Sequence, residues 1–204
     1  NMLYNGIGTP KDLEASLKWY IAAGHDGNIK AMKWAALMYA NGEGTETDYE
    51  QALYWIKKAA EQGDNEAIVS LASYYIMGIG TEKNINQGIR LWQHVGDNGY
   101  YYGYSNLAFS YLDENELGKD AFLAETYWNK IPKDSDIFKS DQEEFYLKLL
   151  KAKEGAQFYY YTHASSDNSA NVIGVATSKL ETRVYIAFTN LDSAWYTISP
   201  DTIL

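Results

Sequence analysis

Small and apolar residues recur in the first part of the chain at the spacing of an amphipathic helix. One such stretch ends at Asn41, and its apolar face carries Ala31, Ala35, Ala36 and Tyr39. A second stretch runs from about Tyr49 to Glu61, and its apolar positions are Ala52, Leu53, Trp55, Ile56 and Ala59. Between the two, a pair of glycines predicts the end of the first helix and Asp48 the N-cap of the second. The pattern therefore predicts a pair of helices.

This helix-pair unit recurs at a constant offset of 36 residues. The loop glycines recur as two series: Gly6, Gly42 and Gly78, and Gly8, Gly44 and Gly80. A fixed period of this length is typical of a solenoid, in which each unit buries its apolar face only by stacking on its neighbours. We therefore expect a mainly helical α-solenoid over residues 1–131, with a truncated first unit and a degenerate fourth.

The aligned positions of successive units separate into small and large side chains. Small side chains let helix axes approach closely, and they occupy two columns: Ala31, Ala67 and Gly103, and Ala36, Ala72 and Ala108. Large side chains occupy two further columns: Tyr20, Ile56, Trp92 and Trp128, and Trp19, Trp55, Leu91 and Tyr127. We interpret both large columns as core that fills the space between stacked helices.

The loop and its flanking helices resemble a known family. The segment from Ala36 to Asp48, followed by Gln51-Ala52-Leu53-Tyr54-Trp55 and Lys58-Ala59-Ala60-Glu61-Gln62-Gly63, is similar to the Sel1-like repeat, a relative of the tetratricopeptide (TPR-like) repeats. The resemblance is fullest in residues 1–67, continues through 68–103 and weakens in 104–131, where Glu114 and Glu116 replace the loop glycines. It implies a bacterial scaffold for protein–protein interaction without catalytic residues. Members of the family are commonly adaptors, and several act in secretion, host interaction or toxin neutralisation.

The 36-residue repeat pattern ends near Pro132. Residues 132–155 indicate a connection and a terminal helix, with Phe145 and Leu149 on its apolar stripe. Residues 156–204 are rich in Tyr, Thr, Val, Ile and Phe, and we expect strands at 157–164, 171–178, 182–189 and 194–199. Because four short strands need a surface to pack on, we expect a small C-terminal antiparallel β-sheet that caps the solenoid. The sheet could also bind a partner, through one face or through an edge strand, and this role is compatible with the cap.

Composition narrows the class of partner. The formal net charge of −10 at pH 7 disfavours nucleic acid or anionic lipid as the main ligand, so a basic or neutral protein is the easier partner. No apolar run reaches the length of a membrane span, and we expect no membrane insertion. With no cysteine, the compartment stays open between bacterial periplasm and cytoplasm. Because the chain opens inside a repeat, we expect upstream residues to have been removed, with any targeting segment among them.

The first helices of the repeats carry positions that the core pattern does not use. By resemblance to tetratricopeptide-like solenoids, these positions line a concave groove, and their mixture of aromatic, Met and polar side chains is favoured at interfaces. The expected partner-binding residues are Lys30, Trp34, Met38, Glu66, Tyr74, Met77, Tyr102, Asn106 and Asp113. For Trp34 an alternative stays open, in which its ring packs against the loop of a neighbouring repeat.

No catalytic or metal-binding set assembles along the sequence. His25, His94 and His163 lie in three separate predicted elements without companion ligands. The Gly-x-Gly pairs recur as helix-loop glycines, which a phosphate-binding loop would not do. We therefore expect no cofactor, no metal and no enzyme, but a protein-binding scaffold. It would be an immunity protein that occludes a cognate toxin, or an adaptor that positions a partner such as a secretion component.

A different class of function stays open in the C-terminal part. An enzyme or small-ligand module would have its site between the β-cap and the last helices, with Tyr159, Tyr161, His163 and Asp167. A catalytic site needs an enclosed pocket with a perturbed acid or base, whereas a scaffold needs a broad aromatic surface.

Overall fold

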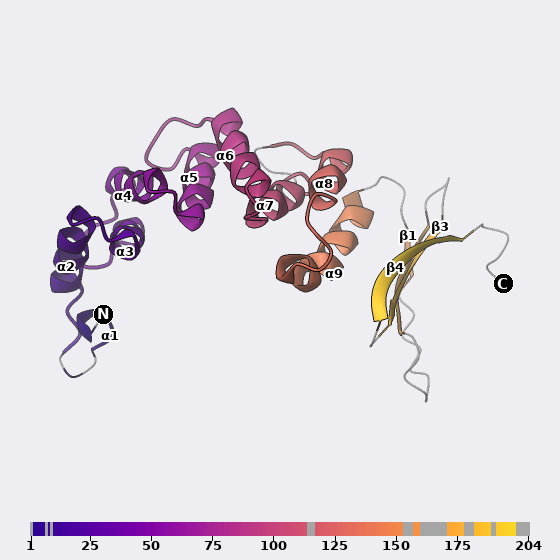
Figure 1. Cartoon of the computed structure of the whole chain (residues 1–204), viewed down its shortest axis with the longest axis horizontal. Coiled ribbons are helices and arrows are strands. Elements are labelled where there is room, and N and C mark those ends of the chain that lie inside the picture. Colours follow the sequence, from indigo (N-terminus) through magenta and orange to yellow (C-terminus); the bar gives the residue numbers. More distant parts are fainter. Residues whose placement is uncertain are drawn as a thin grey trace. The chain divides into compact units, whose positions relative to one another are not determined.

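The computed structural model describes residues 2–6, 8, 10–113 and 117–152, and the strand residues 157–159, 171–177, 182–188 and 191–198. The chain divides into two compact units, Asn1–Ser140 and Asp141–Leu204. The first unit is helical, and the second contains the strands (Figure 1). The division predicted from the sequence, into helical repeats (1–131), a connection with a terminal helix (132–155) and a β-rich cap (156–204), stays a prediction.

The first unit is a run of helices, each packed on the next along the chain. These helices are α1 Met2–Asn5, α2 Leu13–His25, α3 Ile29–Asn41, α4 Tyr49–Glu61, α5 Asn65–Met77, α6 Ile85–Asp97, α7 Tyr102–Ser110 and α8 Ala121–Trp128. The pairs are α3 with α4, α5 with α6 and α7 with α8, while α2 is the second helix of the unit before them (Figure 1). The expected solenoid of helix pairs is therefore confirmed.

Short-range signals set the ends of these helices. Asp48 caps α4, because its carboxylate accepts a hydrogen bond from the backbone N–H of Gln51 at 2.9 Å. Gly42 ends α3 with a φ of 69°, in the left-handed region that favours glycine. Both assignments were predicted from the sequence and are confirmed.

A glycine of α2 makes room for a large side chain of α4. Trp55 on α4 is 2 % exposed, and its ring lies against Gly24 of α2, where a Cβ atom would come within 2.7 Å. All five apolar positions predicted for α4 are buried, and so are Trp92 and Trp128. Four of the eight residues in the two large columns are therefore buried, and Tyr20, Leu91 and Tyr127 are half-buried.

Trp19 is an exception to the predicted core. Its side chain is 66 % exposed although it aligns with Trp55, so its assignment to the core is wrong. The ring of Trp55 is covered by Gly24 and His25 from the preceding second helix, α2. The described residues place no helix in the corresponding position over Trp19.

The second unit contains the end of one helix and four strands. Helix α9, Asp136–Ala152, spans the boundary between the units. The strands are β1 Gln157–Tyr159, β2 Asn171–Thr177, β3 Thr182–Phe188 and β4 Leu191–Ile198, and they pair antiparallel in that order. The role of this sheet as a cap for the solenoid stays a prediction.

Candidate protein-binding groove

A hollow of about 550 Å³ lies between the first helices α3 and α5. We call it the first-helix groove, and its lining residues are Lys30, Lys33, Trp34, Ala36, Leu37, Ile56, Glu66, Ser70 and Tyr74. Ala36 and Ile56 are buried and belong to the core, whereas Trp34 and Leu37 are 39 % and 43 % exposed. Two successive repeats therefore share one partly apolar surface hollow.

Four of the nine residues expected from the sequence meet in this groove: Lys30, Trp34, Glu66 and Tyr74. Met77 and Tyr102 are 52 % and 55 % exposed but do not belong to its lining. Asn106 is half-buried on α7, and Asp113 is exposed beyond the end of that helix. A role of these eight residues in binding stays a prediction.

Met38 was wrongly assigned to the binding face. Its side chain is 0 % exposed and belongs to the core cluster with Met32 and Trp55. Met38 follows Ala35 by three residues along α3, a spacing that returns to the same helix face. Leu37, which the sequence reasoning missed, lies one position earlier and three residues after Trp34. The helical spacing from Trp34 was the signal that could have found it.

The indole of Trp34 is held by two tyrosines of the preceding repeat. The ring of Tyr20 stacks on it with 5.8 Å between centroids and an angle of 11°. The ring of Tyr4 meets it at 5.3 Å and 55°. Trp34 thus packs on helical residues of its neighbour and still keeps a face exposed. A large aromatic fixed in this way loses little conformational freedom when it binds.

A charge cluster links α3 to the start of α5 in the groove. The ammonium of Lys33 donates to the carboxylates of Asp64, at 3.2 Å, and of Glu66. Burial alone would lower the pKa of Lys33, but these hydrogen bonds outweigh it and the pKa is raised. Asp64 also caps α5 by accepting from the N–H of Ala67 at 2.8 Å. The cluster therefore fixes the two helices that form the groove walls.

Tyr74 supplies a hydroxyl to the α5 wall of the groove. Burial raises the pKa of its phenol, and the phenol of Tyr49 raises it further. Tyr74 therefore stays protonated near neutral pH and is able to donate a hydrogen bond. Tyr49, at the start of α4, is 50 % exposed.

The enzyme or small-ligand site considered for the C-terminal part lies mostly outside the described residues. Tyr159 is in β1, whereas Tyr161, His163 and Asp167 lie outside the described residues. Among the residues that are described, no group of three or more His, Asp or Glu side chains is placed to hold a metal ion. In the same part of the chain, no helix is both long and apolar enough to cross a membrane.

Paired helices recur at a constant offset and pack on one another along the chain. Residues 10–113 and 117–128 therefore have the structure of a helical-repeat protein. Residues 1–28, 29–64 and 65–93 each match the Sel1 repeat. The second match contains α3 and α4, and the third begins at α5. The sequence resemblance is therefore confirmed for residues 1–93, and proteins with this repeat are generally scaffolds for protein interaction.

Two solved structures are similar to this chain in fold. The protective antigen c5321 of uropathogenic Escherichia coli, which displays an SLR fold, matches with a TM-score of 0.60 and 22 % identity over 74 % of this chain and 31 % of its own. A Sel1 repeat protein from Oxalobacter formigenes matches with a TM-score of 0.54 and 24 % identity, over 75 % of this chain and 70 % of its own. A comparison with curated proteins gave no match.

Proposed function

We propose that this chain is a non-catalytic scaffold that binds a partner protein through the first-helix groove. The observation that carries the proposal is the meeting of Trp34, Leu37 and Tyr74, from two repeats, in one hollow. Aromatic and aliphatic side chains in such a hollow, edged by polar groups, are the usual anchors of protein interfaces.

The rigidity of the groove supports the same function. Trp34 is stacked on Tyr20, and Lys33 ties α3 to Asp64 and Glu66. The walls are thus formed before a partner arrives, which lowers the entropy lost on binding.

Within this class we propose an immunity or adaptor role. An immunity protein would inhibit a toxin by covering its active site, and an adaptor would hold a partner such as a secretion component without inhibiting it. The support for either role is the resemblance to the repeat family together with the net charge of −10, which favours a basic partner.

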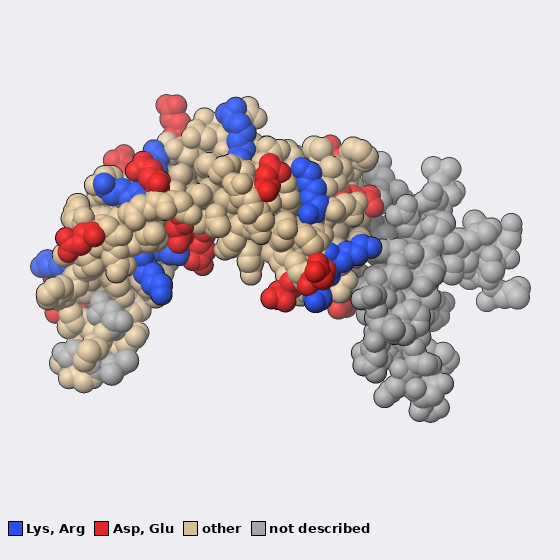
Figure 2. Space-filling view, in the orientation of Figure 1, with Lys and Arg blue, Asp and Glu red and all other residues tan. Residues whose placement is uncertain are grey.

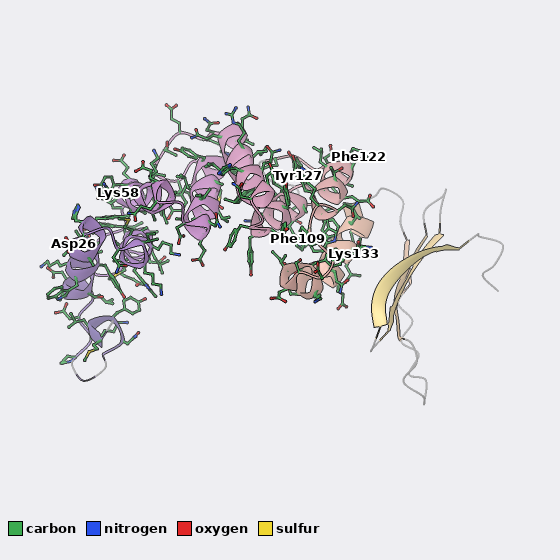
Figure 3. All side chains as sticks on the ribbon, viewed as in Figure 1. Asp26, Lys58, Phe109, Phe122, Tyr127 and Lys133 are labelled. Atoms are coloured by element: carbon green, nitrogen blue, oxygen red, sulfur yellow. The ribbon has the colours of Figure 1, made fainter. Side chains whose placement is uncertain are left out.

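The test needs a candidate partner and a matched control. Proteins encoded next to the gene of this chain are the first candidates, because toxins and their immunity proteins have to be made together. Tyr54 on α4 is the control residue, since it is 42 % exposed, as Leu37 is, and lies outside the groove lining. Lys58, labelled in Figure 3, covers its ring at 5.2 Å.

Each candidate is titrated by calorimetry with the parent chain, the Trp34→Ala/Leu37→Ala variant and the Tyr54→Ala variant. We expect the double variant to lose at least about 2 kcal/mol of binding free energy, as hot-spot residues do, while Tyr54→Ala binds like the parent. Circular dichroism checks that each variant is folded. Unchanged affinity in the folded double variant would place the interface elsewhere, and inhibition of the candidate's activity would separate the immunity from the adaptor role.

A further inference from the structure

A run of acidic residues lies between Lys33 and Lys57. Figure 2 shows acidic and basic side chains interspersed on one face of the helical unit. This run contains no Lys or Arg, and its four acidic residues, which we call the acidic border, are Glu43, Glu46, Asp48 and Glu50. They lie in the loop between α3 and α4 and in the first turn of α4.

Tyr4 connects the acidic border to the first-helix groove. The ring of Tyr4 contacts Trp34, and its hydroxyl donates to the Glu43 carboxylate at 2.8 Å. Glu43 is therefore hydrogen-bonded to a tyrosine whose ring packs on the groove residue Trp34, and the other three acidic residues follow Glu43 within seven positions.

The charges of the acidic border are not neutralised by the described part of the chain. None of its four carboxylates forms an ion pair there, in contrast to Glu66, which pairs with Lys33. The ammonium of Lys11 is near this end and lies over the Tyr4 ring at 5.5 Å. In the described part of the chain, the acidic border therefore keeps an excess of negative charge, whereas the groove lining itself contains Lys30 and Lys33.

We propose that the first-helix groove receives a segment of the partner in which an apolar anchor residue is flanked by Lys or Arg. The apolar side chain occupies the hollow between Trp34 and Tyr74, and the basic side chains face the acidic border. Opposite charges beside an apolar anchor raise the association rate and select the partner. This inference rests on the function proposed above and adds the chemistry of the partner.

The first experiment selects ligands from a phage-displayed library of random peptides on the immobilised full chain. Clones are kept when they bind the parent and fail to bind Trp34→Ala. We expect the kept clones to combine an aromatic or aliphatic residue with neighbouring Lys or Arg. Kept clones without enrichment of Lys or Arg would overturn the inference and leave the groove as a binding site. If no clone depended on Trp34, both the groove and the inference would fail.

The second experiment removes three charges of the acidic border and keeps an acceptor for the hydroxyl of Tyr4. The variant is Glu43→Gln/Glu46→Gln/Glu50→Gln. Asp48 is left in place because it caps α4. The matched control, Asp26→Asn/Glu61→Gln/Asp134→Asn, removes three exposed charges outside the groove lining.

Affinity for one selected peptide is measured by fluorescence anisotropy at low and high salt. We expect the border variant to bind about tenfold more weakly than the parent at low salt, which corresponds to about 1.4 kcal/mol, and the difference to shrink at high salt. The control should bind within about twofold of the parent, since exposed charges far from a site change affinity little. Equal losses of affinity in the two triple variants would mean that only the net charge of the chain affects peptide binding. The acidic border would then have no specific role.

Discussion

Replacement of Trp55 by Ala is the sharpest test of how the repeats stack. Its indole is 2 % exposed and lies between neighbours from its own helix and from α2. The imidazole of His25 meets it at 5.0 Å with an angle of 65°, and Gly24 leaves room for the ring. Truncation to Ala would therefore open a cavity at the contact between two repeats.

The expected loss follows from the buried area. A buried Trp side chain covers about 150–250 Å², which at about 25 cal/mol per Å² gives roughly 4–6 kcal/mol of transfer free energy as an upper estimate. The indole N–H of Trp55 is buried and has no hydrogen-bond partner among the described residues. Removing this N–H would offset part of the lost transfer free energy. We therefore expect Trp55→Ala to lower the free energy of unfolding by about 3–5 kcal/mol, as large-to-small core substitutions do.

Trp19 provides a matched control for this substitution. It occupies the equivalent helix position one period earlier and is 66 % exposed. Trp19→Ala should therefore change stability by less than about 1 kcal/mol, in the range of surface substitutions. The two variants change the same side chain and differ only in what covers it.

Urea unfolding followed by far-ultraviolet circular dichroism measures both variants without relying on Trp fluorescence. For Trp55→Ala we expect a lower midpoint and, because stacking is shared between repeats, a loss of helix signal beyond α4. Similar losses in the two variants, or a parent-like midpoint for Trp55→Ala, would refute the account of the core.

Two further predictions concern the loops and the tyrosines. Gly80→Ala should lower the free energy of unfolding by at least about 1 kcal/mol more than Gly63→Ala. Both glycines have a positive φ, but only at Gly80 would an added Cβ overlap the carbonyl oxygen of Tyr49. Equal urea midpoints for the two variants would argue against this close approach. Burial and the hydrogen bond to Asp97 raise the pKa of Tyr104 from 10.0 to about 12. The folded chain thus holds this proton more tightly than the unfolded chain, and the resulting stability is complete below pH 10 and lost between pH 10 and 12. The advantage of the parent over Tyr104→Phe in urea should accordingly shrink across that window, and a constant difference would contradict it.

Much of the helical fold could be predicted from short-range information in the sequence. Asp48 and Gly42 mark helix ends through contacts within a few residues, so their roles follow from local chemistry. The apolar positions of α4 follow in the same way from the helical period. The offset of 36 residues then implies that these units stack on one another.

The candidate groove could be predicted only in part. The helical period placed Trp34 and Tyr74 on the unused face, and they do line one hollow. The same reasoning assigned Met38 to that face, whereas the exposed neighbour of Trp34 is Leu37. An error of one residue on a helix turns a side chain by about 100°, enough to move it from the core to the surface.

The sequence by itself therefore determined the repeat, its helix boundaries and most of its core, because these depend on short-range spacing that every unit repeats. Tertiary structure decided what each position touches. Trp19 and Trp55 are equivalent in sequence, yet only Trp55 is covered, by Gly24 and His25. The groove likewise exists because side chains of α3 and α5, from two successive repeats, line the same hollow. Burial depends on which helix is the neighbour, and a periodic sequence pattern is the same whether that neighbour is present or not.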